Sequence, residues 1–155
     1  MSFPNDGVYT IRNAGRNLML DLTGDSTNEG NQIQGYAKNG TVAQQWVIKR
    51  QNEPGTPNKT ISIQSNNSGN NGNGCFATAK ENAGEPVVYT RQAFVVDLSG
   101  QADNTFNICF TRGNRNLVLS IPNPKNSAVR LENHAQGNTC QQWEFNRVSD
   151  LQPIA

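Results

Sequence analysis

The sequence has little charge, and its charged residues are scattered. Of the 155 residues 16% are charged, and 13 Lys and Arg against 12 Asp and Glu give a formal net charge of +1. The Lys and Arg residues occur singly and form no basic stripe. Because phosphate binding requires clustered cations, this distribution excludes nucleic acid as the main partner.

Histidine and cysteine are scarce. His134 is the single histidine, and no nucleophile stands in a recognisable relation to it. The three cysteines, Cys75, Cys109 and Cys140, have a spacing that matches no metal motif. We expect buried free thiols, with one disulfide plus one free thiol as the alternative. Because no phosphate loop or metal cluster appears either, we predict that the protein is not an enzyme and uses no cofactor or metal.

Long hydrophobic runs are also missing. No apolar stretch approaches the roughly 20 residues that span a bilayer. Residues 1–6 lack the basic and apolar regions of a signal peptide. We therefore expect a cytoplasmic protein that does not insert into membranes.

Amides and glycine are abundant instead. The chain contains 23 Asn, 12 Gln and 14 Gly. Asn and Gly supply turn conformations with positive φ, so this composition is typical of many short strands joined by tight turns. No segment keeps a helical period, while residues 8–11, 18–22 and 45–48 alternate or read as short apolar strands. The pattern predicts an all-β chain.

Three units of nearly equal length follow one another. A Gln-x-Trp motif ends the first and third units at Trp46 and Trp143, and Phe94 stands at the corresponding place in the second. These aromatics are 48 and 49 residues apart, which indicates a repeat architecture. The repeats cover about residues 7–52, 58–102 and 103–148 of a single domain, residues 1–155. Twelve short strands in three copies predict a closed barrel with hairpins that cap one end.

The matching segments resemble those of a known family. They are residues 7–11, 20–22 and 33–36 and the motifs that begin at Gln44 and Gln141. Over almost its whole length the chain resembles the ricin-B-like β-trefoil lectins, particularly the small single-domain ones of fungi. The resemblance implies a β-trefoil fold, non-catalytic binding of a galactose- or GalNAc-type glycan, and a role in defence. We expect the motif Trp to anchor the core and the motif Gln to satisfy backbone groups.

A sugar site requires an aromatic face for the apolar side of the pyranose and a carboxylate or amide for vicinal hydroxyls. The family places an Asp after the second strand, an aromatic late in the third and an Asn before Gln-x-Trp. The first repeat has Asp21 and Tyr36 at two of these positions, but Ala43 at the Asn position. Asn39 or a water molecule would have to substitute for that Asn. The predicted carbohydrate-binding residues are Asp21, Gln34, Tyr36, Asn39 and Gln44.

The other two repeats lack this set. In the second repeat Ala77 or Thr78 stands at the Asp position and Thr90 at the aromatic position. In the third repeat Ser120 replaces the Asp, Glu132 the aromatic and Cys140 the Asn. We therefore predict one site per chain for glycans or glycoproteins. A single shallow site would bind with about millimolar affinity, roughly 4 kcal/mol. Useful avidity would then require a homodimer or a multivalent target.

An exposed loop offers a rival function. The chain also resembles the fungal β-trefoil inhibitors of serine proteases. These inhibitors present one rigid loop to the cleft of the enzyme. Lys125 would suit a trypsin-like pocket, and the two prolines that precede it would stiffen its loop. The predicted inhibitory loop comprises Pro122, Asn123, Pro124, Lys125 and Asn126. Alternatively, the prolines only shape a turn and Lys125 is solvated, as we expect for Asp25 and Glu29 in the equivalent loop of the first repeat.

Overall fold

The computed structural model describes residues 4–51, 60–66, 75–77, 84–90, 95–100, 104–112, 115–122 and 128–149. Within these residues it contains twelve β-strands and no α-helix. The strands are β1 (Gly7–Asn13), β2 (Leu18–Leu22), β3 (Ile33–Tyr36), β4 (Trp46–Arg50), β5 (Thr60–Ser65), β6 (Cys75–Ala77), β7 (Val88–Thr90), β8 (Val95–Gly100), β9 (Thr105–Arg112), β10 (Arg115–Ser120), β11 (Arg130–Asn133) and β12 (Trp143–Ser149). Short 3₁₀ turns lie at η1 (Thr23–Asp25), η2 (Val42–Gln44) and η5 (Thr139–Gln141).

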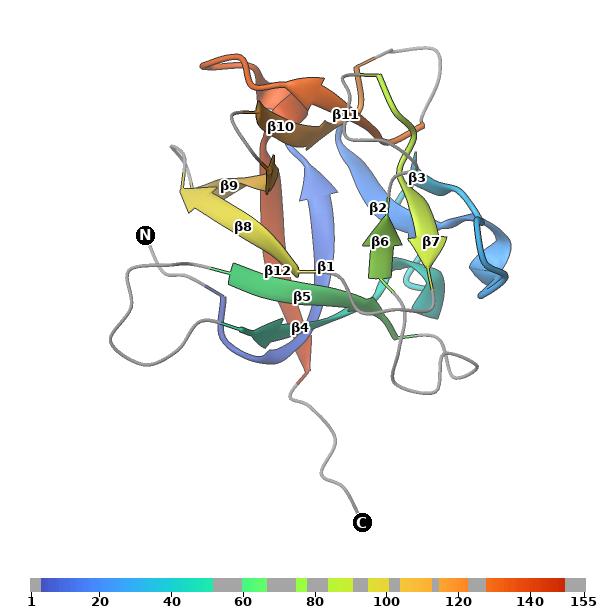
Figure 1. Cartoon of the computed structure of the whole chain (residues 1–155). Helices are drawn as coiled ribbons and strands as arrows, with labels where there is room; N and C mark the ends of the chain where they lie inside the picture. Colours follow the sequence, from blue (N-terminus) through green and yellow to red (C-terminus); the bar gives the residue numbers. More distant parts are fainter. Residues whose placement is uncertain are drawn as a thin grey trace.

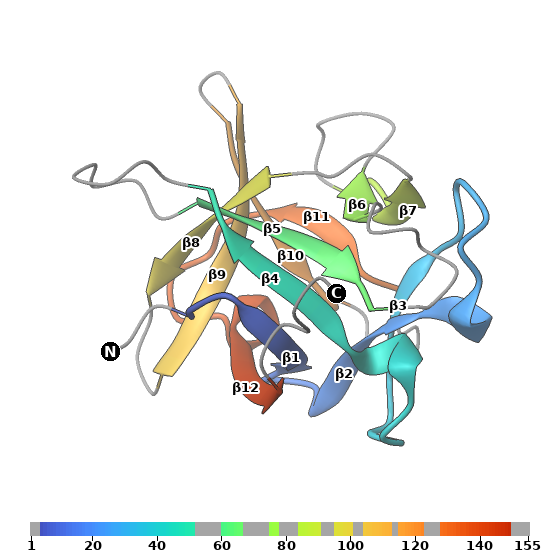
Figure 2. The ribbon, with the colours of Figure 1, turned by 90° about the horizontal axis from the view of Figure 1, so that it is seen from below.

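Six strands close into an antiparallel barrel. β1 pairs with β4, β4 with β5, β5 with β8, β8 with β9, β9 with β12, and β12 pairs again with β1. Figure 2 shows these strands from below, and Figure 1 shows β12 running beside β1. Closure gives each of the six strands two partners, so the barrel leaves no unpaired sheet edge.

The remaining six strands form three hairpins that cover one end of the barrel. They pair as β2 with β3, β6 with β7, and β10 with β11. The hairpins meet through a ring of three backbone hydrogen bonds. The Ile33 amide donates to the Val87 carbonyl at 3.0 Å, Val87 to Val129 at 3.0 Å, and Val129 back to Ile33 at 3.3 Å. This ring lies on a pseudo-threefold axis, and the predicted β-trefoil of three four-strand units is confirmed.

The core forms where the inward faces of barrel and hairpins meet. The two motif tryptophans, Trp46 and Trp143, are fully buried. Each indole N–H donates to a strand carbonyl at the same place in its unit, Leu20 at 3.0 Å and Leu119 at 3.1 Å. The motif Trp is therefore a core anchor, as expected. Phe94, predicted at the corresponding place in the second unit, lies outside the described residues.

The thiols that the structure describes are free. Cys109 is buried and Cys140 is partly exposed, and neither forms a disulfide. Burial, followed by the nearby Asp97 carboxylate, raises the pKa of Cys109 to about 11, which makes this thiol a poor nucleophile. The side chain of Cys75 lies outside the described part. In that part of the chain no helix is long and apolar enough to cross a membrane.

Candidate functional site

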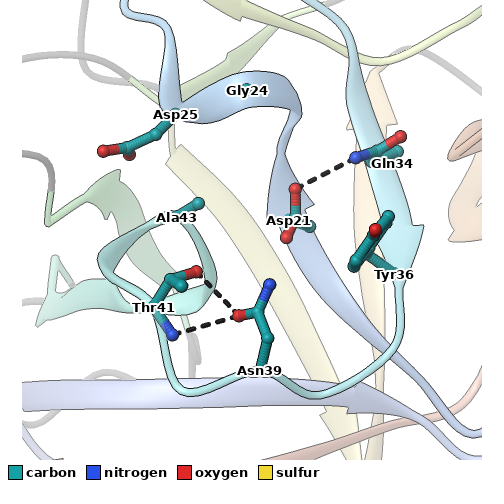
Figure 3. A pocket seen from close by; sticks show the side chains of 8 residues that line it. All are labelled: Asp21, Gly24, Asp25, Gln34, Tyr36, Asn39, Thr41 and Ala43. Atoms are coloured by element: carbon teal, nitrogen blue, oxygen red, sulfur yellow. Dashed lines mark hydrogen bonds between the residues drawn. The ribbon is translucent and has the colours of Figure 1, made fainter.

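A cavity of about 430 Å³ opens in the first unit, between the β2–β3 hairpin and the segment that leads into η2. Its volume falls within the roughly 300–1,000 Å³ that is usual for small-molecule sites. The residues that line it are Asp21, Gly24, Asp25, Gln34, Tyr36, Asn39, Thr41 and Ala43 (Figure 3). Four of the five predicted binding residues are among them, and Gln44 is the exception.

Asp21 is the most deeply placed polar group of the site, since only 4% of its surface is exposed. It lies opposite Gln34 in the β2–β3 register. The Nε2 of Gln34 donates to Oδ1 of Asp21 at 3.1 Å, and the Nε2 of Gln44 donates to Oδ2 at 3.0 Å. Both carboxylate oxygens are therefore fixed from the protein side. Each oxygen retains acceptor capacity for a ligand, because an ionised carboxylate offers about four acceptor positions.

Gln44 lies behind Asp21 and does not line the cavity. It is 1% exposed, and its Oε1 accepts the backbone amide of Asn39 at 3.0 Å. Its Nε2 also donates to the Ala37 carbonyl at 2.9 Å. Gln44 therefore fixes the loop after β3 and orients Asp21. Gln44 would therefore affect a ligand only indirectly, through the position of the loop after β3 and the orientation of the Asp21 carboxylate.

Tyr36 and Asn39 form the outer part of the site. Tyr36 leaves the end of β3 with 51% of its surface exposed, the most exposed large hydrophobic side chain among the described residues. The Asn39 Oδ1 accepts the amide of Thr41 at 3.0 Å and the Thr41 hydroxyl at 2.7 Å. These two bonds set the orientation of the amide, and its Nδ2 points toward Asp21 and Tyr36 (Figure 3). At the family's Asn position, Ala43 contributes only a methyl group.

A glycine lets β3 carry these side chains in close contact with the core. Gly35 lies between Gln34 and Tyr36, and a Cβ there would be 2.6 Å from Cδ1 of Ile121. In the third unit the equivalent position on β11 is Leu131, because Leu131 pairs with Leu119 as Gly35 pairs with Leu20. Close packing of the β3 backbone thus helps to fix the directions of the neighbouring site residues.

The third unit repeats the scaffold of the site but lacks the side chains that are predicted to bind the sugar. Gln141 is 3% exposed, accepts the Ala135 amide at 2.9 Å and donates to the Asn133 carbonyl at 2.9 Å, as Gln44 does in the first unit. This equivalence places Ser120 at the position of Asp21, Glu132 at that of Tyr36 and Cys140 at that of Ala43. In the second unit, Ala77 and Thr90 take the positions of Asp21 and Tyr36 in the strand pairing, and Thr78 lies outside the described residues.

The two motif glutamines offer a matched pair of substitutions. We expect Gln44→Ala and Gln141→Ala to lower the free energy of unfolding by a similar amount, about 1–3 kcal/mol, because each removes two part-buried hydrogen bonds to the backbone. Only Gln44→Ala should also weaken sugar binding, since only Gln44 holds a carboxylate. Urea denaturation and sugar titration of both variants would test this. Equal effects of both variants on binding would contradict it.

The predicted inhibitory loop lies almost entirely outside the described residues, which exclude Asn123, Pro124, Lys125 and Asn126. Its first residue, Pro122, is exposed, and Arg16 donates to the Pro122 carbonyl at 2.8 Å. The loop therefore stays a prediction.

Sequence reasoning missed part of the cavity wall. Asp25 is exposed, as expected, and it also lines the cavity together with Gly24, Thr41 and Ala43. The Gly24-Asp25 turn directly after the Asp21 strand was the available signal, because both residues adopt positive φ (61° and 54°) and turn the chain back over the site. Among the residues that the structure describes, no group of three or more His, Cys, Asp or Glu could hold a metal ion.

Comparison with solved structures finds the same fold in several proteins. The Rhizoctonia solani agglutinin is 28% identical, with 96% of this chain and 99% of that chain covered and a TM-score of 0.78. A Macrolepiota procera ricin B-like lectin in complex with lactose is 20% identical, with 96% and 100% covered and a TM-score of 0.75. The exo-β-1,3-galactanase 1,3Gal43A from Clostridium thermocellum is 16% identical, with a TM-score of 0.75; 95% of this chain matches 31% of that enzyme.

A family assignment follows from the sequence. No curated protein matches the chain. The model of the ricin-type β-trefoil lectin domain-like family matches residues 2–87, just over half of the chain. Family and lectin neighbours together support carbohydrate binding. With twelve strands in the described residues and a cavity in its first unit, this chain belongs to the ricin-type β-trefoil lectin-like family.

Proposed function

We propose that the protein is a non-catalytic lectin that binds one galactose- or GalNAc-type glycan in the cavity of the first unit. The observation that carries the proposal is the fixed, buried Asp21 carboxylate beside the exposed ring of Tyr36. The carboxylate would accept two vicinal hydroxyls in charge-assisted hydrogen bonds. The ring would cover the apolar C–H face of the same sugar.

Asn39 would supply the hydrogen-bond donor that the family's Asn position lacks here. Its oxygen is already engaged by Thr41, so its Nδ2 is the group directed to the ligand. The Macrolepiota lectin binds lactose, which supports a galactoside as the ligand of this site as well. We include a defence role and a cytoplasmic location in the proposal, and a homodimer or a multivalent target would provide the avidity.

Titration with lactose, followed by calorimetry or by NMR shifts, tests the proposal on the purified protein. We expect a dissociation constant near 1 mM, which corresponds to about 4 kcal/mol. Trypsin inhibition should be measured on the same sample, because the Lys125 loop remains an alternative. Stoichiometric inhibition without any glycan binding would reverse the order of the two functions.

Tyr36 provides a second test. Tyr36→Ala should weaken lactose binding about fivefold, because a stacked ring contributes about 1 kcal/mol. Tyr36→Phe keeps the ring and should bind within twofold of the original protein. Neither change should lower the melting temperature much, since half of the side chain is already exposed. Unchanged affinity in Tyr36→Ala would place the sugar elsewhere.

A further inference from the structure

Two sides of the cavity are built from turns of the chain rather than from strands. One side contains Thr41 and Ala43 next to η2, and the other contains Gly24 and Asp25 in η1 (Figure 3). Gln44 fixes the η2 side, because its side chain binds the backbone of the loop that leads there. The η1 side, which we call the η1 wall, depends on other contacts.

The backbone of the η1 wall has a conformation that requires support. Gly24 and Asp25 have φ values of 61° and 54°. A residue other than glycine is uncommon in this left-handed region and persists there when surrounding contacts determine it. Both residues are exposed, so packing in the core contributes little to holding them. Hydrogen bonds at the two ends of the turn are therefore well placed to fix this wall.

The side chain of Asn31 supplies hydrogen bonds at both ends. Its Nδ2 donates to the Thr23 carbonyl at 2.7 Å and to the Ser26 carbonyl at 2.8 Å, which uses both of its N–H groups. Thr23 begins η1 and Ser26 follows its last residue, so the two acceptors flank Gly24 and Asp25. One amide thus closes the start of the β2–β3 connection into a short loop, which limits the conformations open to the wall.

The backbone around Asn31 is attached to the second unit. The Tyr89 amide of β7 donates to the Asn31 carbonyl at 2.6 Å, and the Gly30 amide donates to the Tyr89 carbonyl at 2.9 Å. The Thr90 hydroxyl donates to the Glu29 carboxylate at 2.8 Å. Tyr89 is itself 1% exposed. Asn31 therefore connects a strand that is anchored in the core of the second unit to the η1 wall in the first.

We propose that Asn31 is a positioning residue for the sugar site, through which the second unit fixes the η1 wall. The inference rests on the proposed function, because it concerns a ligand in the same cavity. Asn31 does not line the cavity, so it acts on the ligand through the wall. A preformed wall favours binding, because a mobile wall would have to be ordered when the ligand arrives. The second unit thus contributes to sugar binding although it lacks the predicted sugar ligands.

The experiment measures lactose affinity and backbone order by NMR on isotope-labelled protein. Asn31→Ala should weaken lactose binding about fivefold, which corresponds to about 1 kcal/mol. Without sugar, the order parameters of the Gly24 and Asp25 amides should fall from about 0.85 to below about 0.6, and saturating lactose should restore them. Asn31→Asp keeps the shape of the side chain but cannot donate to the two carbonyls when ionised, so it should behave in the same way.

Glu85 offers a matched control in the second unit. It stands two residues before Val87, as Asn31 stands two residues before Ile33, and its carbonyl accepts the Leu131 amide at 2.9 Å. Glu85→Ala changes a side chain at the equivalent contact between units but does not touch the η1 wall. We expect this variant to keep the lactose affinity and the backbone order of the original protein.

Three results would overturn the inference. The first is unchanged lactose affinity in both Asn31 variants, and the second is weaker binding with an η1 wall that stays rigid. The third is an equal loss of binding in Glu85→Ala, which would indicate a general loosening between units. In all three cases the original protein still binds lactose, so the proposed function survives. If the original protein does not bind lactose, the proposed function fails and the role of Asn31 fails with it.

Discussion

We expect Asp21→Ser to abolish sugar binding at the proposed site and to leave the fold intact. Serine occupies the equivalent position in the third unit, where Ser120 is 1% exposed, so an environment of this kind accommodates it. Hydrogen bonds to a charged group contribute about 1.5–3 kcal/mol each. The loss of two of them should weaken binding by 100-fold or more, which is beyond detection for a ligand of about millimolar affinity.

Lactose titration and urea denaturation of the same variant separate binding from stability. The matched control is Ser120→Ala, which alters the counterpart residue in a unit without the predicted sugar ligands and should bind lactose like the original protein. An Asp21→Ser variant that still binds lactose with unchanged affinity would remove the central residue of the proposed site. A variant that is unfolded would be replaced by Asp21→Asn, which keeps the shape and should also bind far more weakly.

Trp143→Ala should cause the largest loss of stability. The side chain is fully buried, and large-to-small changes of buried aromatics cost about 3–5 kcal/mol. The change also leaves the buried Leu119 carbonyl without the indole N–H that it accepts at 3.1 Å. A protein of this size loses roughly 2–4 °C of melting temperature per kcal/mol, so a decrease of about 10 °C is expected.

Thermal and urea unfolding would measure this effect, with Trp143→Phe as the control. Phenylalanine fills most of the space but cannot donate to Leu119, so its cost should be intermediate. Lactose affinity of the folded variant should not change, because Trp143 belongs to the third unit. A loss below about 1 kcal/mol for Trp143→Ala would show that this anchor is not central to the core.

Much of the fold could be predicted from the sequence because its determinants are local and repeated. The Gln-x-Trp motif places a buried amide and a buried indole two residues apart, and both bind backbone groups of their own unit. Such contacts recur wherever the motif recurs, so Trp46 and Trp143 define the repeat. The ring of hydrogen bonds at the axis left no such signal, because backbone groups of any residue could form it.

The cavity wall was most directly predictable where its residues share one hairpin. Asp21 and Gln34 face each other in the β2–β3 register, and Tyr36 follows two residues later on the same face. The position of Gln44 behind the carboxylate depends on how η2 folds back against β2, which spacing alone does not determine. Asp25 is exposed, as polar turn residues usually are, and its additional place in the cavity wall depends on the positive-φ turn at Gly24 and Asp25.

The hydrogen-bond ring of Ile33, Val87 and Val129 has a consequence for how small the protein can become. Each unit contributes one donor and one acceptor to the ring, and neither can be satisfied inside that unit. A fragment of two units would leave one buried amide and one buried carbonyl without partners. A fragment of one unit could complete the ring only by assembling as a trimer, so the smallest self-sufficient form is three units, whether in one chain or in three.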